Sequence, residues 1–121
     1  MELKTLRNYC ATKPGAVEDY PFGEETLVVK VMGKMFALLP LNLQNEAPQI
    51  NLKCDPVLAD ILRNIYDAVQ PGYHMNKRHW NTVTVDGSIP DHEIYDMVDQ
   101  SYKLVVKSLS KSEREKLQKL E

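Results

Sequence analysis

Two short apolar runs, residues 27–32 and 35–39, flank Gly33-Lys34, and no other part of the sequence restricts the fold as strongly. The first run is rich in valine, a residue enriched in β-strands. Glycine as the first residue of a two-residue connection favours a type II′ hairpin turn, which would place Val31 opposite Phe36. We therefore expect a β-hairpin whose core-facing side is made of Leu27, Val29, Val31, Phe36 and Leu38.

The spacing of apolar residues predicts the remaining elements. They are helices over residues 2–12 and from Asp55, Pro90 and Ser110 onward, and strands over 49–53 and 82–85. Asp55-Pro56 is a strong helix start because aspartate caps an N-terminus and proline fits the first helical position. Antiparallel pairing of consecutive strands then gives an α+β fold, a sheet with helices packed on one face, in a single domain of residues 1–121.

The same spacing assigns faces to two kinds of element. In the helix after Asp55, the expected buried stripe is Leu58, Ile61, Leu62 and Ile65. In the strands, the residues expected to point inward are Ile50, Leu52, Val83 and Val85. The opposite face of the sheet would then present Asn51, Lys53, Trp80, Thr82 and Thr84, together with Lys30.

The composition excludes several classes of protein. With 43% hydrophobic and 26% charged residues, the chain is globular rather than disordered. A formal net charge of −2 argues against a strongly basic nucleic-acid binder but leaves room for a local basic patch. The longest apolar run, residues 35–41, is too short to cross a membrane, and no signal-peptide core is present. With only two cysteines, we expect a cytoplasmic protein with reduced thiols and no membrane partner.

The segment from Tyr73 to Trp80 is a candidate binding surface. It contains two cations, two histidines, a tyrosine and the only tryptophan, and it has no acidic residue. Beside the polar sheet face, it would offer cations to phosphates and aromatic rings to bases or other planar ligands. The candidate residues are Lys53, Tyr73, His74, Asn76, Lys77, Arg78, His79 and Trp80. The alternative is a structural corner in which Trp80 belongs to the core.

Signals of catalysis or metal binding are weaker. Cys54 precedes a helix start, which lowers the pKa of a thiol, but the adjacent Asp55 opposes that shift and no oriented base is apparent. Cys10 fits a small buried hydrophobe on a helix stripe. His74 and His79 are five residues apart and would need further ligands from elsewhere to hold a metal. No phosphate-binding loop or nucleophile elbow is present, so we expect no cofactor and no metal site.

Several short motifs resemble those of the MmcQ/YjbR family of small bacterial proteins. They are Lys13-Pro14-Gly15-Ala16, Pro21-Phe22-Gly23, Gly33-Lys34-Met35-Phe36-Ala37, Asn51-Leu52-Lys53-Cys54-Asp55-Pro56, Pro71-Gly72-Tyr73-His74-Met75-Asn76-Lys77-Arg78-His79-Trp80, Asp86-Gly87-Ser88 and Ser101-Tyr102. The resemblance implies a fold of the CyaY/frataxin type and a "double wing" DNA-binding role proposed from fold comparison. It brings no enzymatic motif. Frataxin-like iron binding is disfavoured because the first helix carries Glu2, Lys4 and Arg7 rather than an acidic ridge.

Three functions follow, in decreasing order of support. The first is a non-enzymatic DNA-binding protein that contacts phosphates through Lys53, Lys77 and Arg78, with the neighbouring aromatic residues near the backbone or bases. The second is a module that binds a small planar or anionic ligand, or a protein, through the same surface. The third, far behind, is an enzyme built on Cys54 and a histidine. The oligomeric state is left open.

Overall fold

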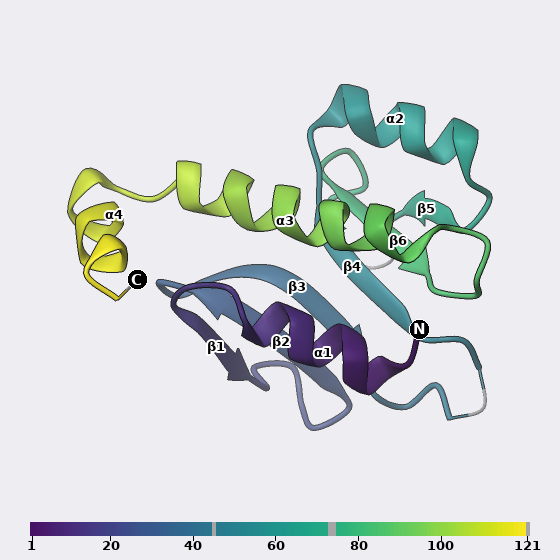
Figure 1. Ribbon diagram of the computed structural model, residues 1–121, viewed down its shortest axis with the longest axis horizontal. Coiled ribbons are helices and arrows are strands. Elements are labelled where there is room, and N and C mark those ends of the chain that lie inside the picture. Colours follow the sequence, from purple (N-terminus) through teal and green to yellow (C-terminus); the bar gives the residue numbers. More distant parts are fainter. Residues whose placement is uncertain (45, 73–74, 121) are drawn as a thin grey trace.

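The computed structural model describes residues 1–44, 46–72 and 75–120. Within these residues, six strands form one antiparallel sheet in the order β1-β2-β3-β4-β6-β5. The elements are α1 (Leu3–Ala11), β1 (Ala16–Asp19), β2 (Thr26–Val31), β3 (Lys34–Pro40), β4 (Gln49–Lys53), α2 (Pro56–Ile65), β5 (Val69–Pro71), β6 (Trp80–Thr84), α3 (Asp91–Lys107) and α4 (Lys111–Gln118). Figure 1 shows α1 and α3 lying across one face of the sheet, with α2 beside β5 and β6. The predicted α+β fold, an antiparallel sheet with helices on one face, is confirmed.

Neither edge strand is predicted by the sequence. Most of β1 is exposed and it carries adjacent acids, so it lacks the apolar alternation that marks a strand. β5 has only three residues and ends at Pro71, a residue that edge strands accept because one side of their backbone is unpaired.

The β2–β3 hairpin forms, but its predicted register is wrong. The turn residues are Met32 and Gly33, both with positive φ (50° and 81°), which makes a type I′ turn. Val31 therefore pairs with Lys34, and not with Phe36 as predicted. Lys30 pairs with Met35, but the next residue of β2, Val29, pairs with Ala37. Phe36 therefore has no partner in β2 and is an extra residue in β3, a β-bulge.

This bulge at Phe36 changes which side chains of β3 face the core. Phe36 and Ala37 both lie in the core, and so does Leu39. Leu38, predicted to face the core, lies on the opposite face, where it lines a pocket. The earlier turn alone would have kept Phe36 and Leu38 on the core side, so it is the extra residue that reverses the faces of the residues after it.

Ser101 of α3 fills the gap that the bulge leaves between β3 and β4. Its hydroxyl donates to the carbonyl oxygen of Phe36 at 2.6 Å and accepts from the backbone N–H of Lys53 at 2.9 Å. The serine is fully buried. One side chain thus satisfies two backbone groups that the sheet leaves unpaired, because β3 and β4 pair only through Ala37 with Leu52 and Leu38 with Asn51.

The core lies between the sheet and the two covering helices. Fully buried members from different elements include Leu6, Leu27, Phe36, Ile50, Ile94 and Val98. Cys10 is fully buried among them, as predicted, and burial raises the pKa of its thiol to about 12. No helix in the described part of the chain is long and apolar enough to span a bilayer.

A polar cluster joins α1 to α3 at the rim of this core. The phenol of Tyr9 donates to Asp99 Oδ1 at 2.7 Å, and Lys13 forms an ion pair with the same carboxylate. The Lys13 ammonium also lies 4.6 Å from the centre of the Tyr9 ring. Burial opposes ionisation of Asp99, but the hydrogen bonds from Lys13 and Tyr9 outweigh it and lower the pKa of the carboxyl.

The predicted buried stripe of α2 is half right: Leu58 and Leu62 are partly buried, with Leu62 packed against the core, but the prediction is wrong for Ile61 and Ile65. The buried residue of this helix is Ala59, whereas Ile61 and Ile65 are 48% and 63% exposed. α2 stands at one end of the sheet rather than across it, so only a narrow side of the helix meets the core (Figure 1). Its predicted start is confirmed: Asp55 Oδ2 accepts from the backbone N–H groups of Val57 and Leu58 at 3.1 and 3.2 Å.

Candidate functional site

A pocket of about 590 Å³ lies on the face of the sheet opposite α1 and α3. Its floor comes from β3, β4 and β6, and its rim from the loops before β2 and β6. The lining residues are Phe22, Thr26, Met35, Leu38, Pro40, Gln49, Asn51, Met75, Asn76, Trp80 and Thr82. Among the described residues, the lining is therefore aromatic, aliphatic, thioether, amide and hydroxyl, with no charged side chain.

Trp80 forms one wall of this pocket. It is half-buried, so it is neither a core residue nor a freely exposed ring. Its position is fixed from the neighbouring strand, where the N–H of Gly72 donates to the Trp80 carbonyl at 2.7 Å. A Cβ added to Gly72 would lie 2.8 Å from the Trp80 Cβ, so glycine is required for this close approach.

The polar part of the floor is a buried pair, Asn51 and Thr82, on adjacent strands. The Thr82 hydroxyl donates to Asn51 Oδ1 at 2.5 Å, which orients the amide. No described residue accepts a hydrogen bond from Asn51 Nδ2. The pocket therefore offers a fixed amide donor in apolar surroundings, where a hydrogen bond to a ligand is worth most.

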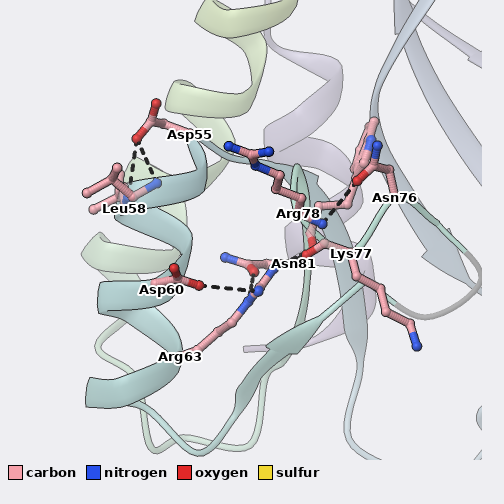
Figure 2. A network of polar contacts seen from close by, with 10 residues as sticks. Asp55, Leu58, Asp60, Arg63, Asn76, Lys77, Arg78 and Asn81 are labelled. Carbon is pink, nitrogen blue, oxygen red and sulfur yellow. Dashed lines mark hydrogen bonds and ion pairs between the residues drawn. The ribbon is translucent and has the colours of Figure 1, made fainter.

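The loop between β5 and β6 is held from behind by Arg63 of α2. Figure 2 shows its side chain reaching from the helix to the loop. Arg63 Nε donates to the buried Asn81 Oδ1 at 2.8 Å, and its terminal nitrogen donates to the carbonyl oxygens of Lys77 and, at 3.2 Å, Trp80. Asn76 closes the loop by accepting from the backbone N–H of Arg78 at 3.0 Å. The described residues 76–80 are thus held by the side chains of Arg63 and Asn76.

Sequence reasoning did not identify Arg63. The signal that points to it is Asn81, a polar residue near the start of β6, at a buried strand position on the same face as the inward Val83. A buried amide needs a partner, and an arginine on the neighbouring helix is a suitable donor. The same reasoning applies to Asn51, which the sequence placed on the outer face but did not connect with Thr82.

The structure separates the predicted binding residues into groups. Asn76 and Trp80 line the pocket, and Lys53, half-buried, pairs with Trp80 in the sheet. Lys77 and Arg78 are exposed and line a second hollow of about 410 Å³ with Pro56, Val57, Asp60 and Arg63. In Figure 2 the Lys77 side chain points away from α2 and that of Arg78 points toward it.

The remaining candidates are less informative. His79 is half-buried. Its carbonyl oxygen accepts from the backbone N–H of Cys54 at 2.8 Å, so its backbone links the start of β6 to the end of β4. Tyr73 and His74 lie outside the described residues. Within the described ranges, no three His, Cys, Asp or Glu side chains gather as metal ligands would.

The Cys54 thiol has the opposite character from an activated nucleophile. It is 8% exposed. Burial and the neighbouring Asp55 carboxylate raise the pKa of the thiol, although Arg63 acts against them. A catalytic cysteine needs a lowered pKa, so the environment of Cys54 favours the neutral, inert form at neutral pH.

Comparison with known proteins gives a family. Residues 11–104 match the YjbR family model. The chain belongs to the YjbR family. It is 38% identical to YjbR of Escherichia coli K12 over 120 residues, which cover 99% of this chain and 100% of that protein. It is 35% identical to YyaQ of Bacillus subtilis over 104 residues, or 76% of this chain and 87% of YyaQ.

Two solved structures have the same fold as this YjbR family member. The crystal structure of the Deinococcus radiodurans protein DR2400 has a TM-score of 0.86 at 38% identity, covering 95% of this chain and 86% of that one. A crystal structure of a Pseudomonas syringae protein has a TM-score of 0.74 at 28% identity, covering 86% of this chain and 98% of that one.

Proposed function

We propose that this YjbR family protein is a non-enzymatic binding protein whose open sheet face takes a small, planar, largely uncharged ligand. The observation that carries the proposal is the 590 Å³ pocket, whose described lining has a tryptophan wall and no charge. Pockets for small molecules have this size and character, mostly apolar with a few placed polar groups.

The lining restricts the class of ligand. Trp80 offers a face for stacking, and Met35 and Met75 are thioethers that adapt to the edge of a ring. Asn51 supplies a hydrogen-bond donor for a carbonyl or ring nitrogen. An ionised ligand would lose water without meeting an opposite charge in the described lining, which is unfavourable.

The length of the pocket also restricts the size of the ligand. It runs from Thr26 on β2 to Trp80 on β6, across the spacings between β2, β3, β4 and β6, or roughly 14 Å. That length exceeds a single ring and suits a fused heteroaromatic ring with a polar substituent. Of the two small-ligand classes that the sequence suggested, planar and anionic, the pocket supports the planar, uncharged one.

The test uses the only tryptophan as the reporter. The chain is titrated with adenosine and nicotinamide, and with the matched anions adenosine 5′-monophosphate and nicotinic acid, while Trp80 emission and its indole N–H resonance are followed. We expect saturable changes with a neutral probe and weaker changes with its anionic counterpart. The proposal is contradicted if a screen of neutral heteroaromatic fragments leaves the open-face resonances unmoved, or if anions bind as tightly.

DNA binding is the second candidate, and a specific observation favours it. Lys77 and Arg78 are exposed on a loop that Arg63 holds in place, so their backbone is ordered before any phosphate binds. Two such contacts would give weak, strongly salt-dependent affinity. Fluorescence anisotropy with a labelled duplex tests this. The double substitution Lys77→Ala and Arg78→Ala should lower both the affinity and its salt slope, whereas Lys4→Ala with Lys116→Ala, which changes exposed lysines elsewhere, should not.

Two further parts of the proposal are broader. We infer a cytoplasmic location because both cysteines are free and buried, as thiols kept in a reducing compartment are. The expected likeness to the CyaY/frataxin fold stays a prediction, supported by the arrangement of an antiparallel sheet with helices on one face.

A further inference from the structure

Helix α2 exposes a row of large aliphatic side chains that the fold does not use. Val57, Ile61 and Ile65 are 69%, 48% and 63% exposed. They are four residues apart, so they lie along one side of the helix. Single exposed apolar residues are ordinary, but a continuous row of them on one helix marks an interaction surface.

The row continues into a groove between α2 and α3. This groove has a volume of about 210 Å³, and its lining includes Leu58, Leu62 and Ile65 from α2 and Asp96, Met97 and Gln100 from α3. The apolar surface is therefore broader than one helix edge. A helix from another molecule fits such a surface, because its apolar side chains recur at the same spacing.

The charges along this groove change sign from one end to the other. Glu93 and Asp96 of α3 lie beside Ile65 and Tyr66, at the C-terminal end of α2. At the N-terminal end of α2, Lys103 and Lys107 lie around a hollow with Asp55. On the other side of that end, the hollow containing Val57 also holds Arg78, together with Asp60 and Arg63, which form an ion pair with each other. One end of the apolar row is thus acidic, and cations predominate at the other.

We propose that a second copy of this chain docks on this surface, with the two α2 helices antiparallel and a two-fold axis near Ile61. A two-fold interface brings the same patch of both copies together, so residues before and after the axis exchange partners. Val57 of each copy then meets Ile65 of the other. The acidic end of each groove meets the basic end of the other, whereas a parallel arrangement would bring like charges together.

Sedimentation velocity over a wide concentration range tests the dimer. We expect a concentration-dependent shift from monomer to dimer that Ile61→Glu removes, raising the dissociation constant by ~tenfold or more because the charge would lie on the axis. Val17→Glu is the matched control, because Val17 is 61% exposed but lies on the far edge strand β1. Both variants should unfold at the temperature of the unaltered chain, since neither side chain is in the core.

Charge reversal makes the test specific to this orientation. Asp96→Lys and Lys103→Glu should each weaken the dimer, and the two together should restore it, because the opposite charges then meet again across the axis. A chain that is monomeric at every concentration overturns the proposal, and so does a dimer that withstands Ile61→Glu. Failure of a double charge reversal to restore the dimer would overturn the antiparallel arrangement.

Discussion

The two faces of the sheet are built for different purposes. On the face covered by α1 and α3, nearly every inward side chain is apolar, and the buried Ser101 serves to satisfy backbone groups. On the open face, the buried Thr82 hydroxyl donates to the Asn51 amide, and both residues line the pocket. The comparison teaches that polarity inside the covered face maintains the fold, whereas on the open face the polar group that we propose for ligand binding is the Asn51 amide.

The largest effect is expected where the covered face depends on one hydroxyl. Ser101→Ala leaves the Phe36 carbonyl and the Lys53 N–H without their bonds in a place that water does not reach. We expect a loss of about 3 kcal/mol in the free energy of unfolding, measured by urea denaturation. Ser108→Ala, on an exposed serine at the end of the same helix, is the control. A loss no larger than that of the control would mean that Ser101 is not the link between α3 and the bulge.

The next effect concerns the position of Trp80. Gly72→Ala brings a methyl group against the Cβ and carbonyl of Trp80, neither of which can rotate away. We expect the free energy of unfolding to fall by about 2 kcal/mol, with a shift in tryptophan emission. Gly23→Ala is a useful comparison, because no atom lies within 4 Å of the added Cβ and only its positive φ resists the change. Unchanged emission in Gly72→Ala would show that this glycine does not set the tryptophan wall.

A smaller and pH-dependent effect is expected at the rim of the covered face. The pKa of Asp99 is lowered in the folded chain, so its ionised form adds stability at pH values above the unfolded-state pKa, and this stability is lost as the pH falls through the folded-state value. Asp99→Asn should therefore cost about 1 kcal/mol at pH 7 and progressively less below about pH 4. Unfolding curves of both chains between pH 2 and 7 measure this. A difference that stays constant with pH would mean that the Asp99 charge adds nothing.

The smallest effect on stability, and the largest on binding, is expected on the open face. Asn51→Leu keeps the branched shape of the side chain and removes the amide, so the free energy of unfolding should change by less than about 1 kcal/mol. Binding of a neutral probe should be lost, as followed by Trp80 emission. Asn42→Leu, on an exposed loop outside the pocket, should change neither quantity. If Asn51→Leu unfolds the chain, the contrast between the two faces is wrong.

The sequence predicts those parts of the fold that are set by local chemistry. Asp55 caps α2, the helix predicted from Ser110 onward begins there with a capping box of Ser110 and Glu113, and the strand over 49–53 has the bounds of β4. What it misses depends on tertiary context. The type I′ turn puts Met32 at positive φ, which a side chain disfavours and which no local pattern indicates. The exposed side of α2 has helical apolar spacing, and spacing alone does not distinguish a core from a docking surface.

In the candidate site, too, local patterns predict some features and tertiary contacts determine the others. Alternation along β4 and β6 correctly places Asn51, Trp80 and Thr82 on one face, because a strand has a period of two. The pocket itself is not predictable in this way, since Phe22 and Met75 reach it from loops far apart in the sequence. The role of Arg63 is likewise not predictable from the sequence of the loop, because Arg63 lies on α2 and contacts the loop only in the folded chain.

The extra residue at Phe36 has a consequence for how this domain diversifies. Beyond the bulge it puts Leu38 and Pro40 in the lining of the pocket and sends Ala37 and Leu39 to the interior. Deleting one residue there would exchange the two sets, and the ligand would meet an alanine and a leucine in their place. A change of strand length by one residue, with no substitution anywhere in the pocket, would thus give a relative a different specificity.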